Sequence, residues 1–179
     1  MLSLLRNIPQ SFNSVKKYEW DYERFIGRQV KGLSLGIIGF GRLGKIMAHF
    51  GYSFGMTVYI YDPYVSKKDI LTINPVYKRV ELEELCRQSD VISLHVHVTD
   101  RTRQMVNYDF IEKMKENSYL INTSRGEIVN ENDIIDYLKN GKLSGYGTDV
   151  IEHEFSNIHE SKLIKEAKKN KYNIIITPH

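Results

Sequence analysis

Short apolar runs alternate with amphipathic stretches from residue 33 to the end of the chain. The apolar and β-branched runs predict strands at residues 33–38, 57–61, 77–80, 91–95, 119–122, 144–150 and 173–177. Apolar residues at helical spacing predict helices from Arg42 past Phe50, over 81–88, from Asn107 to Lys115 and from Asn130 to Gly141. A lysine-rich helix is predicted over 155–172. Alternating strands and helices predict an α/β fold, a doubly wound parallel sheet of about seven strands with helices on both faces.

The first 32 residues show no such alternation. Residues 1–8 predict a short apolar helix ended by Pro9, and a second helical segment follows. Three large aromatic residues then fall within five positions, around Trp20. They could pack on their own domain or on a second subunit, where Trp and Tyr bury much area at low entropic cost. We therefore expect residues 1–32 to form an arm, with a dimer contact as one of its two roles, and residues 33–179 to form one domain.

The strand at 33–38 ends in the pattern Gly39-x-Gly41-x-x-Gly44. Gly39 permits a tight turn, Gly41 lets the backbone approach phosphate oxygens, and Gly44 lets the next helix pack closely on the strand. The helix that begins near Arg42 then directs its free N–H groups and positive dipole end at a pyrophosphate. The pattern predicts a dinucleotide site.

Asp62 follows the strand at 57–61, where the adenosine ribose of such a dinucleotide would lie. A carboxylate there accepts hydrogen bonds from the ribose hydroxyls and repels a 2′-phosphate. Asp62 therefore predicts NAD as the cofactor rather than NADP, and the alternative is an ordinary aspartate at a surface turn.

Four other predicted strands also end in polar or ionisable groups. These are His95 with His97, the segment 123–126, the segment 149–154, and the final Pro178-His179. Each has a simple structural interpretation when taken singly. Because the carboxyl ends of parallel strands meet at one edge of the sheet, their convergence favours a functional site there.

Composition narrows the class of protein. The 179 residues carry a net charge of +3, with 41% hydrophobic and 26% charged residues, as in an ordinary folded domain. The lysines after residue 160 alternate with glutamates and not with aromatics, which favours a solvated helix face over a nucleic-acid site. The single cysteine, Cys86, is expected in the core. No run is long enough to span a membrane or to form a signal core, so we expect a cytoplasmic protein with no membrane partner, and no metal site is predicted.

The chain resembles the D-isomer-specific 2-hydroxyacid dehydrogenases, most closely their phosphoglycerate dehydrogenase branch. Matching motifs span about residues 30–179, and the arm, with Arg6-Asn7-Ile8 and Trp20, resembles the segment that enters this family's cofactor domain. The motifs are Gly39-Phe40-Gly41-Arg42-Leu43-Gly44 with Tyr61-Asp62-Pro63-Tyr64; Ser89-Asp90-Val91-Ile92-Ser93-Leu94-His95 with Thr99-Asp100-Arg101-Thr102; Asn122-Thr123-Ser124-Arg125-Gly126 with Gly141-Lys142-Leu143; and Asp149-Val150 with Glu154 and Thr177-Pro178-His179.

The resemblance implies reversible hydride transfer between NAD and C2 of a 2-hydroxy or 2-oxo acid. It implies that Arg125 holds the substrate carboxylate, that His179 is the acid/base, and that Glu154 orients His179. The same resemblance assigns the remaining site residues to the cofactor. Arg42 and Leu43 would contact the pyrophosphate, and Asp62 the adenosine ribose. Val96, Thr102, Thr123 and Asp149 would line the nicotinamide end, with Asp149 holding the carboxamide. Gly39, Gly41, Gly44 and Ser124 complete the set of cofactor-binding residues.

The chain departs from the family pattern at His97 and at Phe155, where proline is usual. We expect the family's preceding substrate domain and the helix that follows the histidine to be absent from this form. We therefore expect this 179-residue form to bind NAD, to turn over slowly or not at all, and to form a homodimer through its cofactor domain and arm. The alternatives are a non-catalytic NAD-sensing or interaction module and a dimerisation fragment.

Overall fold

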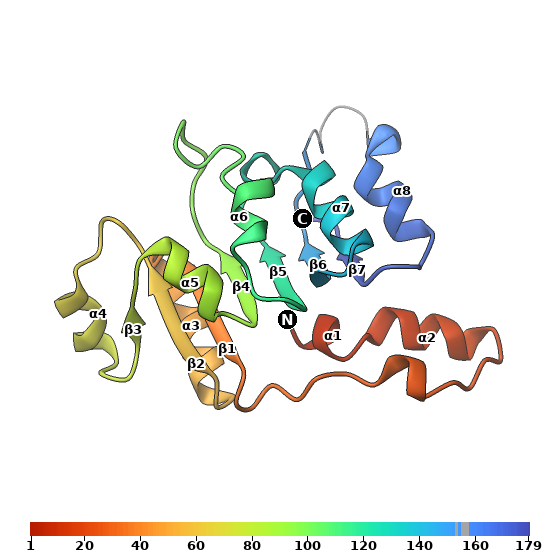
Figure 1. Ribbon diagram of the computed structural model, residues 1–179, viewed down its shortest axis with the longest axis horizontal. Helices are drawn as coiled ribbons and strands as arrows, with labels where there is room; N and C mark the ends of the chain where they lie inside the picture. The colour runs from red at the N-terminus through yellow and green to blue at the C-terminus, as the bar shows by residue number, and fades with distance from the viewer. Residues whose placement is uncertain (153, 155–157) are drawn as a thin grey trace.

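Seven parallel strands form one sheet in the order β3-β2-β1-β4-β5-β6-β7 (Figure 1). The structure is a computed structural model and describes residues 1–152, 154 and 158–179. The strands are β1 (Ser34–Ile38), β2 (Thr57–Tyr61), β3 (Lys78–Arg79), β4 (Val91–Leu94), β5 (Ser118–Asn122), β6 (Leu143–Thr148) and β7 (Ile174–Ile176). The predicted doubly wound sheet is confirmed, and the strand order reverses direction between β1 and β4.

Helices cover both faces of the sheet, each over its own apolar core. One core joins buried residues of α5, α6, α7 and α8, and the other joins buried residues of α1, α3 and α4. The α-helices are α1 (Leu2–Leu5), α2 (Ile8–Lys16), α3 (Arg42–Ser53), α4 (Lys67–Ile73), α5 (Leu82–Gln88), α6 (Tyr108–Glu112), α7 (Glu131–Lys139) and α8 (Lys162–Lys168). Short 3₁₀ turns are η1 (Glu23–Phe25), η2 (Gly126–Ile128) and η3 (Ile158–Glu160). Cys86 is buried in the first core, as predicted, and burial raises the pKa of its thiol to about 12. No helix within the described residues is both long and apolar enough to cross a membrane.

Two helices differ from the sequence prediction. α4 was not predicted, although Ser66 caps it by accepting a hydrogen bond from the Asp69 N–H, and its own Ile70 is buried in the core. The lysine-rich helix is shorter than predicted: α8 covers Lys162–Lys168, and Asn170 has a left-handed backbone (φ 51°) that ends it. Residues 155–157 of that prediction lie outside the described residues.

The prediction that Pro9 ends the first helix is wrong. α1 ends at Leu5, and Asn7 turns the chain with a φ of 51°. Pro9 lies in the first turn of α2, where its missing N–H costs no hydrogen bond. Leu4 and Leu5 belong to the core, and Leu4 packs on the glycines of β6, so α1 is part of the sheet's cover.

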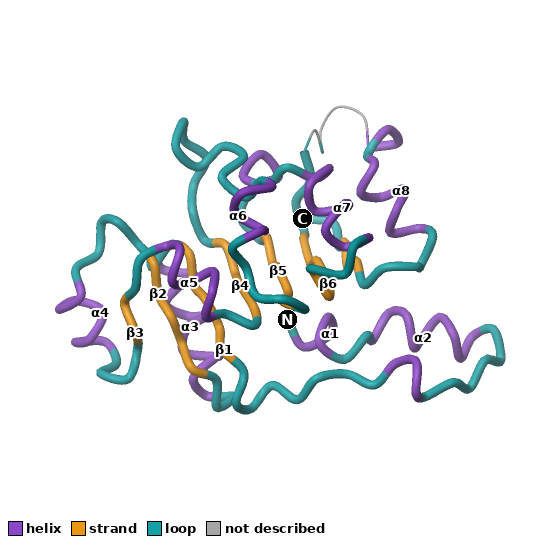
Figure 2. Tube along the Cα trace, in the orientation of Figure 1, coloured by secondary structure: helices purple, strands orange, loops and turns teal. Residues whose placement is uncertain are grey.

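The chain then leaves the sheet and returns to it. The Arg28 N–H donates to the Leu5 carbonyl over 2.9 Å, which closes the intervening excursion at its base. Within it α2 and η1 project away from the sheet (Figures 1 and 2). The side chains of Tyr18 and Trp20 are 99% and 82% exposed. The three aromatics therefore do not pack on their own domain, which removes the first of the two interpretations drawn from the sequence.

A buried carboxylate joins the base of the arm to the amino-terminal edge of the sheet. Asp90 accepts hydrogen bonds from the backbone N–H and hydroxyl of Ser34 at 2.8 and 2.7 Å. It also pairs with Lys115 at 2.8 Å and with Arg28 at 3.2 Å. Burial alone would raise the pKa of Asp90, but the hydrogen bonds from Lys115 and Ser34 outweigh burial and lower it to about 2.

Asp90→Asn should destabilise the fold at neutral pH by about 2–4 kcal/mol, because two cations and a backbone N–H lose a charged partner. The folded pKa lies below the unfolded value of 3.8, so the carboxylate stabilises above pH 4. About 2 kcal/mol of that contribution should be lost as the pH falls towards 2. Urea unfolding of both proteins at pH 7 and near pH 2 measures the effect. An equal difference in the free energy of unfolding between the two proteins at both pH values would contradict this role of Asp90.

Candidate functional site

The turn from β1 to α3 leaves no room for side chains at two of its three glycines. A Cβ on Gly44 would lie 2.0 Å from the Gly39 carbonyl oxygen, and a Cβ on Gly39, whose φ is +92°, would lie 2.4 Å from the His95 carbonyl oxygen. A Cβ on Gly41 would meet no atom within 4 Å. Gly39 and Gly44 are thus required by the fold, whereas Gly41 faces open space.

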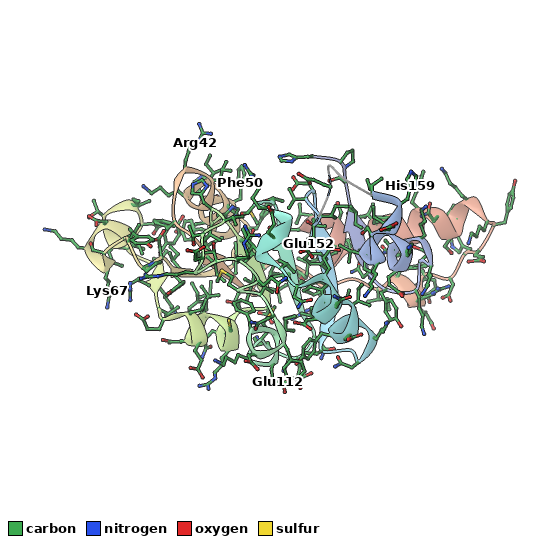
Figure 3. The ribbon with its side chains drawn as sticks, turned by 90° about the horizontal axis from the view of Figure 1, so that it is seen from above. Arg42, Phe50, Lys67, Glu112, Glu152 and His159 are labelled. Carbon is green, nitrogen blue, oxygen red and sulfur yellow. The ribbon has the colours of Figure 1, made fainter. Side chains whose placement is uncertain are left out.

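Two side chains follow this turn at the start of α3. Arg42 is the first residue of the helix and points outward, away from the body of the molecule (Figure 3). Leu43 is half-exposed. Both residues lie beside the open space above Gly41, at the N-terminus of a helix of twelve residues. The positive dipole end of such a helix favours an anion.

Asp62 lies at the end of β2 and ties the glycine turn to it. Its Oδ2 accepts a hydrogen bond from the Phe40 N–H at 2.7 Å, and its Oδ1 accepts one from the Tyr64 N–H at 2.8 Å. Each carboxylate oxygen has a further lone pair for a hydroxyl donor. Asp62 is therefore held in place by the backbone and keeps the capacity to bind a ribose.

At the end of β4, Val96 lies against Gly39, and His95 is partly buried. The Nε2 atom of His95 lies 3.0 Å from the Ser93 hydroxyl, while its Nδ1 is buried without a hydrogen-bond partner within the described chain. Burial lowers the pKa of His95 to about 4, so the ring is neutral at pH 7. Thr102 closes the following loop, because its hydroxyl donates to the His97 carbonyl at 2.6 Å.

The segment after β5 is shaped by Asn122, which the sequence marked only as part of a motif. Its side chain accepts from the Ser124 N–H at 3.1 Å and donates to the Arg125 carbonyl at 2.9 Å. Ser124 is buried and donates its hydroxyl to the Leu94 carbonyl at 2.7 Å, so this hydroxyl braces β4 against β5. Thr123 and Arg125 are exposed, and the guanidinium of Arg125 donates to the Ser124 carbonyl at 2.6 Å.

The ends of β6 and β7 bring three predicted site residues to one pocket of about 710 Å³: Asp149, Glu154 and His179. Glu154 Oε1 lies 3.6 Å from His179 Nδ1, an ion-pair distance slightly longer than a hydrogen bond. The side chain of Glu154 is 19% exposed and that of His179 is 58% exposed. Asp149 Oδ1 is buried and, within the described residues, has no hydrogen-bond partner.

Arg125 is not among the described residues that line this pocket, but its neighbour Gly126 lies against Ile151, which does line it. A Cβ on Gly126 would lie 2.2 Å from the Ile151 carbonyl carbon, so the two loops touch through their backbones. The predicted residues thus form two groups along the edge. The glycine turn, Arg42, Leu43 and Asp62 lie at β1 and β2, whereas Arg125, Asp149, Glu154 and His179 lie at β5, β6 and β7.

The edge fits an extended dinucleotide. The open space above Gly41 and the N-terminus of α3 suit a pyrophosphate. The unpartnered Oδ1 of Asp149 suits an amide N–H donor such as a carboxamide. The sequence analysis did not predict the loop-shaping role of Asn122 or the contact of Gly126 with Ile151. An asparagine at the end of a buried strand is the sequence signal that could have indicated the role of Asn122.

Comparisons with known proteins agree with this geometry. The family model for the D-isomer specific 2-hydroxyacid dehydrogenase NAD binding domain matches residues 1–179. The D-3-phosphoglycerate dehydrogenase of Bacillus subtilis (strain 168) is 38% identical over 177 residues, which cover 99% of this chain and 32% of that protein. The solved structure of D-2-hydroxyisocaproate dehydrogenase superimposes with a TM-score of 0.89 at 32% identity, over 99% of this chain and 55% of the other.

A further solved structure contains the cofactor. The NAD-dependent formate dehydrogenase of Staphylococcus aureus, in complex with NAD, has a TM-score of 0.88 at 28% identity over 99% of this chain and 52% of the other. The chain thus spans between a third and about half the length of these relatives. With its glycine turn, Asp62 and doubly wound sheet, this chain belongs to the family of NAD-binding domains of the D-isomer-specific 2-hydroxyacid dehydrogenases.

Proposed function

We propose that this chain is the cofactor half of an enzyme that interconverts a D-2-hydroxy acid and its 2-oxo acid. The observation that carries the proposal is the Glu154–His179 pair, which shares its pocket with Asp149 at the carboxyl edge of an NAD-binding sheet. NAD, when bound, supplies the acceptor or donor of the hydride. The protein's own residues bind and orient the cofactor and the substrate, and they exchange the proton with the substrate oxygen.

Each site residue has a role in this proposal. The guanidinium of Arg125 binds the substrate carboxylate and polarises the carbonyl. His179 donates a proton to the carbonyl oxygen in reduction and accepts it in oxidation. Glu154 faces His179 Nδ1, which leaves Nε2 for the substrate oxygen. The neighbouring Asp149 receives the carboxamide, and Val96, Thr102 and Thr123 line the nicotinamide end. Ser124 belongs to the same cofactor-binding segment, and its buried hydroxyl braces that segment against β4.

Small 2-hydroxy and 2-oxo acids are the substrate class in this proposal, and the cytoplasm is the expected compartment. In this proposal the reacting atoms are shielded from water only when both walls of the cleft are present. The relatives are longer than this chain, and in this proposal their additional residues form the other wall of the cleft. We propose that the 179-residue chain alone binds NAD and oxidises NADH with 2-oxo acids far more slowly than a typical dehydrogenase.

Gly41→Ala should weaken NAD binding at least about tenfold while leaving the unfolding temperature unchanged. Gly41 has φ −74° and ψ −161°, which alanine can adopt, and a Cβ at this position has no protein atom within 4 Å. The added methyl group should therefore clash only with a bound pyrophosphate. Gly44→Ala is the matched control, because its Cβ would collide with the Gly39 carbonyl and should lower the unfolding temperature. Calorimetric titration and thermal unfolding provide the two measurements. Unchanged NAD affinity in a folded Gly41→Ala variant would contradict the assignment of this turn.

Arg125→Ala should abolish binding of a 2-oxo acid to the NADH complex of the chain, with the affinity for NADH kept within about twofold. Arg125→Lys should restore only part of it, because an ammonium cannot form the bidentate pair. Titration of the NADH complex with a 2-oxo acid, followed by fluorescence, measures both. Equal binding by all three proteins would instead favour a non-catalytic NAD-sensing module. Turnover of the unmodified chain near 1–1000 per second would contradict the proposed slow rate.

We also propose that the protruding arm makes a homodimer, with Trp20 of each copy covered by the other. Trp20 and Tyr22, together with Ile8 and Ile26, are exposed and line a pocket of about 930 Å³. Trp20→Ala should shift the chain towards monomer by at least about tenfold in dissociation constant. Sedimentation equilibrium against the parent measures it, and Lys17→Ala is a control outside the pocket lining. An unchanged mass for Trp20→Ala would count against the arm.

A further inference from the structure

We propose that Glu131 is a positioning residue for the Glu154–His179 pair. Its carboxylate holds the backbone segment that carries Glu154, although Glu131 lies on a different element, at the start of α7. The inference rests on the proposed function, because His179 and Glu154 are catalytic only there. The contacts from which it is argued can be tested without NAD binding or turnover.

Glu131 is the first residue of a helix that is both capped and packed in the core. The Asn130 side chain caps α7 by accepting hydrogen bonds from the Asn132 and Asp133 N–H groups at 3.1 and 3.4 Å. The helix is fixed in the core by Ile134 and Leu138. The backbone of Glu131 is therefore held at the start of a capped helix, where the helix dipole also favours a carboxylate.

The carboxylate of Glu131 reaches the segment that follows β6. Its Oε1 accepts a hydrogen bond from the Glu152 N–H at 2.9 Å, across 21 positions of sequence. Both residues are only half-exposed, so water competes weakly for this charge-assisted bond. Figure 3 shows Glu152 near the middle of the molecule, between α8 and the half that holds the glycine turn.

The bond acts at the right place to position Glu154. The segment is fixed on its near side by the Thr148 hydroxyl, which accepts from the Val150 N–H at 3.2 Å, and by the close contact of Gly126 with Ile151. Glu154 then folds back, with Oε2 accepting from the Ile151 N–H at 3.4 Å. The anchor from Glu131 lies two residues before Glu154, between these contacts and the side chain that faces His179.

A simpler role for Glu131 is to stabilise α7 through the helix dipole alone. Two conservative substitutions separate the roles. Glu131→Gln keeps an oxygen at the same reach and removes the charge. Glu131→Asp keeps the charge at the helix start and shortens the reach. Positioning predicts that Gln rescues and Asp does not, whereas a dipole role predicts the reverse.

The experiment is NMR of the 179-residue chain with labelled histidine and backbone nitrogen. Glu154→Gln first defines how the His179 ring resonances move when the pair is broken, with His179→Gln giving the assignment. Glu131→Asp and Glu131→Ala should move these resonances in the same direction, and Glu131→Gln should leave them near the parent. Hydrogen exchange at the Glu152 amide should be at least about tenfold faster in the Asp and Ala variants only.

The proposal is overturned if the Asp and Ala variants keep the parent's His179 resonances and Glu152 exchange, or if Gln behaves as Ala does. NAD affinity should stay within about twofold in the three Glu131 variants, because the glycine turn lies on the other half of the sheet. Loss of NAD binding by the parent would refute the proposed function and leave these NMR outcomes intact, so the two failures are distinguishable.

Discussion

Backbone contacts that only glycine permits hold the carboxyl edge of this sheet together. Gly44 packs α3 onto the carbonyl of Gly39, and Gly39 in turn lies against the end of β4. Gly126 brings the loop after β5 onto the segment after β6 in the same way. Parallel pairing delivers the strand ends to one edge, and these contacts then fix the loops that leave them.

In the proposed function, the edge divides into a half that binds the adenosine end of NAD and a half that carries the acid–base pair. Asp62, held by the Phe40 and Tyr64 amides, belongs to the first, and Glu154 with His179 belongs to the second. Buried polar atoms without partners are rare in folded proteins, and two of those in the described residues lie along this edge, on His95 and Asp149. Polar capacity left unused by the fold is available to a cofactor.

Local sequence was sufficient for the strands, the glycine turn and the place of Asp62, because each depends on residues close together in the chain. The burial of α1 was not predictable in the same way. Leu4 packs there against glycines of β6 more than 140 positions away, a contact that no local pattern encodes. The bond from Glu131 to Glu152 was missed for the same reason, since a glutamate in a first helical turn has a sufficient local explanation.

The roles of Arg125, Glu154 and His179 came from family resemblance, and the structure adds their geometry rather than their chemistry. A crystal structure of the 179-residue chain with NAD is the most direct test of the account. It should place the pyrophosphate over Gly41 and Arg42, the adenosine ribose on Asp62, and the carboxamide within hydrogen-bond distance of Asp149. A nicotinamide ring bound away from the edge shared by Asp149, Glu154 and His179 would contradict the account.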